Sequence, residues 1–363
     1  MRTATRRDML LGAAALAAGA FAAPGPALSV QASPEPQSWP DPVMPGVTHR
    51  RIETNGIRLH VAEQGEGPLV LLCHGFPECW YSWRHQLPAL AKAGFRAVAP
   101  DLRGYGRSDQ PQGNEKYTLL DDIGDVVGLV DALDGGPAVI AGHDIGATIA
   151  WQAALIHPDR FRAVIALSVP FRRQAFGTTV PPTTLMPKTE DAVFYQLFLQ
   201  TPEAEVALGR NLRRTFRSQF YALSGHRPPL APGGFPGGMI PRGSPSLIDP
   251  PFLPAWVRDA DIDVYVEAFA RSGFHGPLAW YRNVDVSWAQ AAPTADAKVT
   301  VPALYMAGDH DFVAQVYSRF IPEQADMVPG LRTPIMLAGC GHWTQQERAP
   351  QVSAAMADFL RSV

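Results

Sequence analysis

The 363-residue sequence predicts an α/β fold, in which a mostly parallel sheet carries helices on both faces and an inserted helical cap. Short, continuous apolar runs recur along the chain, as expected of strands that are buried on both faces. Helical patterns lie between most of these runs, and such alternation is typical of a parallel sheet with crossover helices. The alternation stops between residues 170 and 296, and this insertion after a core strand predicts a cap over the strand ends.

The strands and helices are predicted in the following order. Residues 51–63 contain an extended run on each side of Asn55-Gly56, which predicts a hairpin. Apolar runs predict the other core strands at 69–73, 96–99, 138–141, 164–167, 303–307 and 335–338. Helical patterns cover 119–133 and 147–157 in the core and 192–200, 204–220 and 262–271 in the cap.

These elements divide the chain into a core in two parts, residues 47–169 and 297–363, and a cap of residues 170–296. Residues 34–46 are rich in proline, alanine and serine and are interpreted as a linker. Residues 227–254, inside the cap, are rich in proline and glycine. This stretch is too long for an ordinary connection, so we expect a functional or mobile loop.

The N-terminus predicts an export signal. Arg6-Arg7 precedes an apolar run over residues 9–23, and Ala20-Phe21-Ala22 offers a cleavage site flanked by small residues. The run is too short and too weakly hydrophobic for a stable membrane anchor. We therefore interpret residues 1–33 as a twin-arginine signal peptide and the start of the linker, and expect a periplasmic or secreted protein.

Composition narrows the class of protein. The chain is 46% hydrophobic and 18% charged, which fits one large globular catalytic unit. Its net charge of −3 gives no reason to expect a nucleic acid or an anionic membrane as a partner, and the oligomeric state stays open. The three cysteines are an odd number and predict buried free thiols rather than a disulfide framework.

The most informative segment is Gly142-His143-Asp144-Ile145-Gly146, which directly follows an apolar strand. It has the frame of a nucleophile elbow, a tight turn from strand to helix, with aspartate at the central position. A carboxylate needs no base to deprotonate it. It suits displacement at a saturated carbon, because it forms an alkyl ester that water can later cleave.

Cleavage of such an ester needs a base and an acid that orients it. His342 follows the strand at 335–338, and Asp311 follows the strand at 303–307; Asp309 is the alternative acid. Backbone N–H groups of Phe76 and Ile145 are predicted to face the oxyanion that forms during hydrolysis. We expect His74 to hold its loop by hydrogen bonding. The sequence has no metal-ligand spacing, so neither a metal nor a cofactor is expected.

Several segments together resemble the soluble epoxide hydrolases of the α/β-hydrolase fold, from about residue 47 to the C-terminus. The core segments are 75–84, 103–108, 340–345 and the elbow. In the cap, 194–197 and 276–283 resemble the two tyrosine motifs of the family. The resemblance implies that Tyr195 and Tyr281 hydrogen-bond the epoxide oxygen. The sequence departs from the family at Ile145, where many relatives have tryptophan, in its leader, and in the Pro/Gly-rich stretch.

The expected function is therefore hydrolysis of a small apolar epoxide to a vicinal diol through an aspartyl ester, with water as the co-substrate. We expect an apolar pocket, to which the following aromatic residues contribute: Phe76, Trp80, Trp83, Phe274 and Trp343. A haloalkane dehalogenase is the nearest alternative, but Phe76 and Ile145 lack the side-chain N–H donors that serve halide release. A non-catalytic binding protein is the other alternative, and it predicts the loss of at least one catalytic group.

Overall fold

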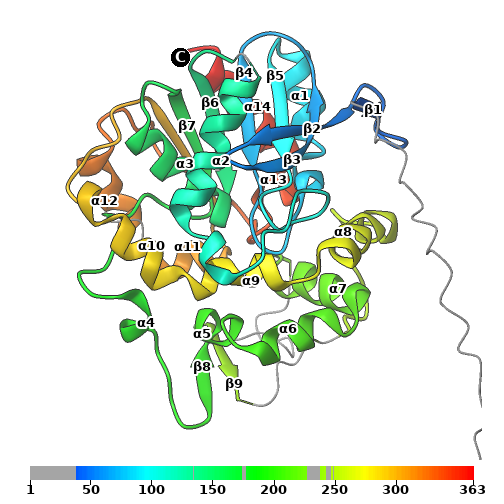
Figure 1. Cartoon of the computed structure of the whole chain (residues 1–363), viewed down its shortest axis with the longest axis vertical. Helices are drawn as coiled ribbons and strands as arrows, with labels where there is room; N and C mark the ends of the chain where they lie inside the picture. Colours follow the sequence, from blue (N-terminus) through cyan, green and yellow to red (C-terminus); the bar gives the residue numbers. More distant parts are fainter. Residues whose placement is uncertain (1–37, 134, 174–176, 227–237, 243–246, 248) are drawn as a thin grey trace, which may run out of the picture. The chain divides into compact units, whose positions relative to one another are not determined.

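The computed structural model describes residues 38–133, 135–173, 177–226, 238–242, 247 and 249–363. In these residues, nine strands form one sheet in the order β1-β2-β3-β5-β4-β6-β7-β10-β11 (Figure 1). At one edge of the sheet, each of the strands β1, β2, β3 and β5 runs antiparallel to the next. The remaining neighbours, β5-β4-β6-β7-β10-β11, are all parallel. The predicted mostly parallel sheet is thus confirmed.

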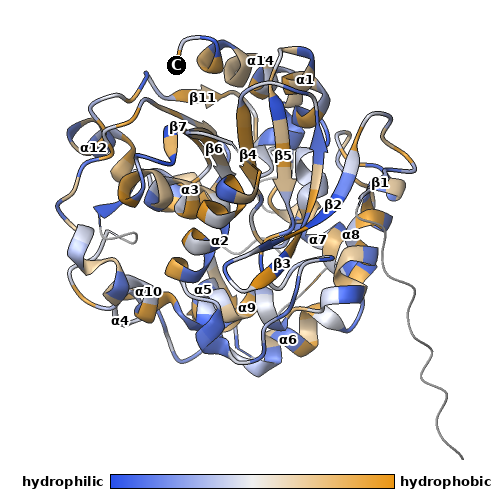
Figure 2. Cartoon of the chain, turned by 45° about the horizontal axis from the view of Figure 1, so that its top comes forward, coloured by the Kyte–Doolittle hydropathy of each residue, from blue (hydrophilic) through white to orange (hydrophobic). Residues whose placement is uncertain are grey.

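The predicted core strands are all present. Their bounds, with that of an additional edge strand β1, are β1 Ser38–Pro40, β2 Thr48–Thr54, β3 Ile57–Gln64, β4 Leu69–Cys73, β5 Arg96–Pro100, β6 Ala138–His143, β7 Phe161–Leu167, β10 Ala303–Gly308 and β11 Ile335–Leu337. Every residue of β4, β6 and β10 is buried, as expected of strands covered on both faces. Figure 2 shows hydrophobic residues concentrated on the central strands.

Helices cover both faces of the sheet. Helices α2 and α3 pack together on one face, and α1 and α14 pack together on the other (Figure 1). The bounds in the core are α1 Gln86–Lys92, α2 Leu119–Ala132, α3 Ile145–Ile156, α11 Phe312–Val316, α12 Phe320–Met327, α13 Thr344–Glu347 and α14 Ala349–Leu360, with 3-10 helices η1 Trp80–Trp83 and η2 Asn114–Lys116. No helix in the described part of the chain combines the length and apolar character needed to cross a membrane.

The cap lies between β7 and β10 in the sequence. Its elements are α4 Pro182–Leu185, β8 Ala192–Phe194, α5 Tyr195–Leu199, α6 Pro202–Gly209, α7 Leu212–Ala222, β9 Met239–Pro241, α8 Asp259–Ser272, α9 His275–Arg282 and α10 Val284–Gln290. The predicted helix at 262–271 is confirmed within α8.

Two cap predictions were wrong in detail. Residues 192–200 begin as β8, which pairs with β9, and become helical only at Tyr195. Residues 204–220 form two helices because Asn211 caps the start of α7, where its side chain accepts a hydrogen bond from the N–H of Arg214. Much of the Pro/Gly-rich stretch 227–254 lies outside the described residues, but β9 falls within it.

Part of the expected linker, residues 34–46, is a strand. Pro40 of β1 pairs with Thr48 of β2, and Trp39 stacks on the rings of His49 and His60 at 5.7 and 5.9 Å between centroids. The expected signal peptide lies outside the described residues. All three cysteines are buried and free, which confirms the predicted thiols.

Candidate active site

Asp144 occupies the turn between β6 and α3 with φ 53° and ψ −117°, a backbone conformation that is strained for a residue with a side chain. The flanking glycines explain how the turn closes so tightly. A Cβ on Gly142 would overlap the carbonyl oxygen of Gly146, and a Cβ on Gly146 would overlap the carbonyl oxygens of Cys73 and His74, at the end of β4 and just after it. The turn therefore has the geometry of a nucleophile elbow.

The loop after β4 approaches Asp144 from the other side. Gly75 passes so close that a Cβ there would lie 2.5 Å from the Cβ of Asp144. The next residue, Phe76, donates its backbone N–H to Oδ1 of Asp144 at 3.0 Å. Ile145 begins α3, and the first N–H groups of a helix have no partner within the helix. His74 holds the loop, because it accepts a hydrogen bond from the N–H of Leu102 at 3.1 Å.

His342 lies between two carboxylates. Its Nδ1 is 3.0 Å from Oδ1 of Asp311, and its Nε2 is 4.0 Å from Oδ2 of Asp144. Asp311 is completely buried, whereas Asp309 is exposed to solvent. The structure thus brings Asp311, rather than Asp309, to the histidine.

These carboxylates set the charge of the histidine. Burial alone would lower the pKa of His342, but the charges of Asp311 and Asp144 outweigh it and raise the pKa to about 9. Burial also opposes ionisation of Asp311, yet the imidazole of His342 holds the pKa of that carboxyl below its usual value. The resting site therefore contains an imidazolium between two carboxylates.

Sequence analysis missed Ser168, which follows β7 and adopts φ 72°. Its Oγ lies 3.2 Å from Nδ1 of His342 and thus contacts the same nitrogen as Asp311. A signal was available, because Ser168 sits directly after a buried strand, at the edge of the sheet where Asp144 and Asp311 also lie. Ser168 therefore restrains the imidazole ring at the nitrogen that Asp311 also holds.

A second missed feature is a buried ion pair beneath the site, formed by Glu78 and His143. Oε2 of Glu78 lies 2.7 Å from Nδ1 of His143, and Nε2 of His143 lies 2.8 Å from the carbonyl oxygen of His342. The N–H of Gly75 also donates to Glu78, at 2.9 Å. Both ring nitrogens of His143 therefore lie within hydrogen-bond distance of an oxygen.

Burial alone would raise the pKa of Glu78, but the imidazole of His143 outweighs it and holds the pKa below its usual value. The side chains of Gln345 and Gln346 donate to the other oxygen of Glu78 at 3.0 and 2.9 Å. This pair therefore ties the loop that carries Phe76, the turn that carries Asp144 and the loop that carries His342 to one another.

The cap contributes two tyrosines to the same site. Tyr281 of α9 is buried, and its ring packs edge-on against Phe76 at 5.2 Å between centroids. Tyr195, at the start of α5, accepts a hydrogen bond from the side chain of Gln196 at 3.0 Å. Burial, reinforced by the charge of Asp144, raises the pKa of both phenols well above their usual value. Both therefore remain protonated and able to donate a hydrogen bond.

Helix α9 is fixed to the core beside Tyr281. The side-chain amide of Asn283 donates to the carbonyl oxygens of Tyr117 and Ala279 at 3.3 and 2.9 Å, and also to that of Asn114. Gly276 of the cap and Gly104 of the core approach so closely that a Cβ on either would meet the other backbone. These contacts hold the segment that positions Tyr281.

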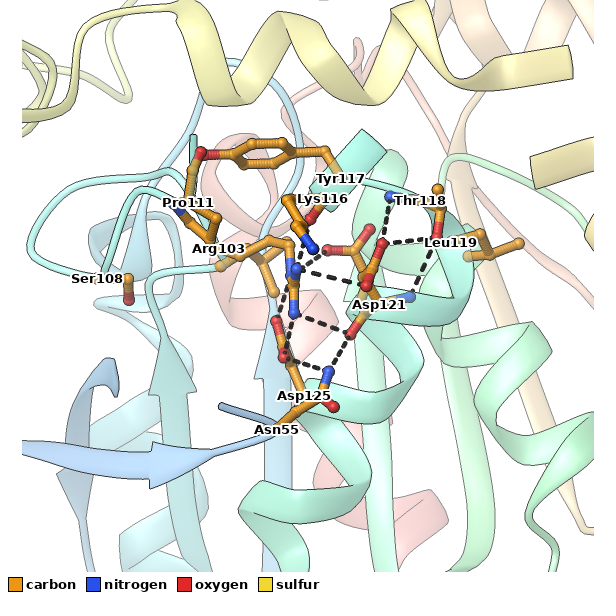
Figure 3. Close-up of polar contacts among 12 residues, drawn as sticks. Asn55, Arg103, Ser108, Pro111, Lys116, Tyr117, Thr118, Leu119, Asp121 and Asp125 are labelled. Atoms are coloured by element: carbon orange, nitrogen blue, oxygen red, sulfur yellow. Dashed lines mark hydrogen bonds and ion pairs between the residues drawn. The ribbon is translucent and has the colours of Figure 1, made fainter. Parts of the chain in front are cut away.

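The core loop under α9 is anchored by Arg103, as Figure 3 shows. The guanidinium of Arg103 donates to both carboxylate oxygens of Asp125, at 2.7 and 2.6 Å, and to the carbonyl oxygen of Lys116. Asn55, in the turn between β2 and β3, donates to Asp125 at 3.0 Å. Two parallel bonds fix a planar guanidinium in orientation as well as in position, so this loop is a rigid support.

Core and cap together enclose a pocket with about 1040 Å³ of space between atoms, part of it open to solvent. Asp144, His342, Tyr195, Tyr281 and Phe76 all line it. Most of the other lining residues are apolar: Phe198, Leu199, Ala207, Leu208, Ala222, Leu223, Ile240, Leu247, Phe312 and Val313. The prediction of an apolar pocket is confirmed. Of the five aromatic residues expected to line it, only Phe76 is among the described lining residues. The other four pack in the hydrophobic core: Trp80, Trp83, Phe274 and Trp343.

The sheet and the Asp-His-Asp arrangement define a hydrolase of the alpha/beta hydrolase fold, and the family model of that description matches residues 68–349. Epoxide hydrolase A of Mycobacterium tuberculosis is 43% identical over 326 residues, which cover 86% of this chain and 97% of the relative. An epoxide hydrolase of Caballeronia sordidicola is 40% identical over 319 residues, 88% of this chain and 95% of the relative.

Solved structures agree with these relatives. An epoxide hydrolase from an endophytic Streptomyces superposes with a TM-score of 0.83 at 40% identity, over 87% of this chain and 96% of that one. Epoxide hydrolase A from Mycobacterium thermoresistibile gives a TM-score of 0.79 at 39% identity, over 87% and 98%. The chain belongs to the epoxide hydrolases of the α/β-hydrolase fold, as the sequence motifs had indicated.

Proposed function

We propose that this chain converts apolar epoxides into vicinal diols in two steps. In the first, a carboxylate oxygen of Asp144 attacks the less hindered ring carbon, and the electron pair of the broken C–O bond goes to the epoxide oxygen. Tyr195 and Tyr281 donate hydrogen bonds to that oxygen as charge develops on it. One phenol gives its proton to the alkoxide and regains a proton from solvent.

In the second step, water cleaves the ester. His342 takes a proton from water, and the hydroxide attacks the ester carbonyl of Asp144. The N–H groups of Phe76 and Ile145 stabilise the oxyanion that forms. The diol leaves with the oxygen that attacked the ring, and His342 returns its proton. Esterification removes the charge of Asp144, one of the two charges that raise the pKa of His342, so the pKa falls and the ring releases its resting proton to solvent before it accepts one from water. After the diol leaves, the carboxyl proton of Asp144 passes to His342 and restores the resting charges.

The observation that carries this proposal is the pairing of a carboxylate nucleophile with two neutral phenols in one apolar pocket. Opening an epoxide ring puts negative charge on an oxygen that stays attached to the substrate, and a phenol is a strong donor to such an oxygen. Release of a halide would leave the two phenols without a role. A non-catalytic binding protein would not need Asp144, His342 and Asp311 in contact.

An isotope experiment tests the covalent route. With enzyme in excess over epoxide in ¹⁸O-labelled water, we expect the label in the peptide that contains Asp144 and an unlabelled first diol, because water attacks the carbonyl carbon. Labelled diol in the first turnover would show direct attack of water on the ring and would overturn the mechanism. Asp144→Asn provides the control and should form neither ester nor diol.

We further propose export by the twin-arginine route, supported by Arg6-Arg7 and the weakly hydrophobic run that follows. A fusion of residues 1–40 to a reporter that is active only when exported in folded form should reach the periplasm. Replacing both arginines by lysine should abolish its export. Continued export of the double-lysine fusion would point to an ordinary secretory signal.

A further inference from the structure

The wall of the pocket formed by α7 has two chemically different ends. One face of α7 and its C-terminal end line the pocket. Ser218 and Gln219 form a polar pair on this face, and Ala222 and Leu223, each four residues later, form an apolar pair one helical turn away. The N–H of His342 donates to the carbonyl oxygen of Leu223 at 2.8 Å, which places the apolar pair beside the reacting groups. The polar pair lies one turn farther along the helix, about 6 Å along its axis.

Ser218 is an unusual residue for this position. It is only 4% exposed, yet its hydroxyl has no hydrogen-bond partner among the described residues, although a helical serine commonly bonds a carbonyl in the preceding turn. The hydroxyl oxygen of Ser218 retains some accessible surface, and because the residue lines the pocket, this surface faces the pocket. Buried polar groups are normally paired, which suggests that a ligand supplies the partner.

Gln219 extends the same polar patch. Its side chain is half-buried, lines the pocket and likewise makes no side-chain hydrogen bond within the described part of the chain. The neighbouring walls, formed by Phe198 and Leu199 of α5 and Leu208 of α6, offer no polar side chain as a partner. A ligand that occupied only the apolar part of the pocket would leave both groups unpaired.

The charge of the pocket limits what the polar patch can bind. Among the described lining residues, His342 is the only one that carries a positive charge, and it is already held by two carboxylates. An ionised substrate group would therefore find no free counter-charge among the described residues that line the pocket. A hydroxyl and an amide each both donate and accept, which suits a neutral oxygen such as a hydroxyl group.

We propose that Ser218 and Gln219 form a specificity subsite for a neutral hydroxyl group on the substrate, several bonds from the epoxide ring. The preferred substrate is then a hydroxylated aliphatic epoxide rather than a plain alkyl epoxide. This inference rests on the proposed function, because it names the substrate class for the same site. It assigns these residues to substrate selection and not to either chemical step.

The test compares ω-hydroxy-1,2-epoxyalkanes of increasing chain length with the 1,2-epoxyalkanes in which a methyl group replaces the hydroxyl. The wild-type enzyme should show a higher kcat/KM for the hydroxylated epoxide at the chain length that reaches the subsite. One net hydrogen bond corresponds to roughly a 2- to 10-fold effect. Ser218→Ala and Gln219→Leu should each lower kcat/KM by about that factor on the hydroxylated epoxide and not on its alkyl partner.

Gln351→Leu is the matched control, because it makes the same change on an exposed position of α14. It should leave the preference of the wild-type enzyme as it is. Equal losses on both members of a pair in the subsite variants, or no preference in the wild type at any chain length, would overturn the subsite. Failure of the wild type to form diol from every epoxide of either series would instead overturn the proposed function, and the subsite with it.

Discussion

The side chain of His143 is hydrogen-bonded to the backbone of His342, with 2.8 Å between Nε2 of His143 and the carbonyl oxygen of His342. The residue that precedes the nucleophile thus holds the loop of the general base. His143 can do so only while its other nitrogen is held by Glu78, and neither side chain is exposed to solvent. The alignment of the two catalytic groups therefore depends on one buried ion pair.

Glu78→Gln should strongly destabilise the enzyme, because removal of one partner of a buried pair leaves the other charge uncompensated. We expect a loss of about 3–5 kcal/mol in the free energy of unfolding, measured by urea denaturation. Glu63→Gln is the control, since Glu63 pairs with arginines that are partly exposed, and should cost no more than about 1 kcal/mol. Similar losses in the two variants would refute a special role for the buried pair.

His342→Gln should trap the alkyl-enzyme ester. Attack by Asp144 needs no base, whereas hydrolysis of the ester does. Incubation with an epoxide should add the mass of the substrate to the peptide that contains Asp144, and consumption of epoxide should stop after one equivalent, with no diol released. Recovery of unmodified peptide after incubation would argue against a separate hydrolytic step.

The protonation of His342 should depend on the charge of Asp144. With the pKa raised to about 9, the ¹⁵N signals of His342 should titrate near that pH in the resting enzyme. Asp144→Asn imitates the uncharged ester and should move the midpoint downward, whereas Asp309→Asn, at an exposed position, should not. An unchanged midpoint in the Asp144 variant would contradict the proposed coupling.

The same shift has a consequence for stability. The pKa of His342 lies above its usual value of 6.5, so the charged ring contributes fully to stability below about pH 6.5. This contribution is lost as the pH rises through about 9. Thermal unfolding of the wild type should show the loss in this window, and His342→Gln should show less of it.

Tyr195→Phe and Tyr281→Phe should each slow ester formation by a factor on the order of 10²–10³, because each removes one donor to the developing alkoxide. The double variant should be almost inactive. The rings keep their volume, so the fold should survive. Stopped-flow measurement of single turnovers separates the two steps, and hydrolysis of any ester formed should be almost unaffected. Parental rates in the double variant would identify both tyrosines as packing residues.

Asn283→Ala should act on the first step alone. It removes the amide that holds α9 to the core, and displacement of Tyr281 by about 1 Å is expected to slow ester formation roughly 10- to 100-fold. Asn114→Ala is the control, because the carbonyl oxygen that accepts from Asn283 remains. A variant that binds epoxide more weakly at an unchanged rate of ester formation would contradict the positioning role.

Local pattern predicted the core strands, the elbow at Asp144 and the loop positions of Asp311 and His342, because each rests on a short run of neighbouring residues. The sequence contained no sign of the Glu78–His143 pair, which joins residues 65 positions apart. It placed Ser168 after a buried strand but did not indicate its contact with His342, 174 positions away. It proposed Asp311 as the acid and kept Asp309 as the alternative, and only the fold, which buries Asp311 and exposes Asp309, separates the two. In the cap, the pairing of β8 with β9 overrode the helical pattern at 192–194.

Phe76 has a consequence for how this enzyme can change. Its backbone N–H contacts the carboxylate of Asp144, and its ring supports the phenol ring of Tyr281. Any movement of this loop displaces two things at once. It moves the N–H that stabilises the oxyanion during ester hydrolysis, and it moves the ring that supports Tyr281, the donor to the alkoxide during ring opening. Position 76 is therefore a poor target for altering selectivity by directed evolution, and libraries should concentrate on α6 and α7, whose side chains shape the pocket without bearing on both steps.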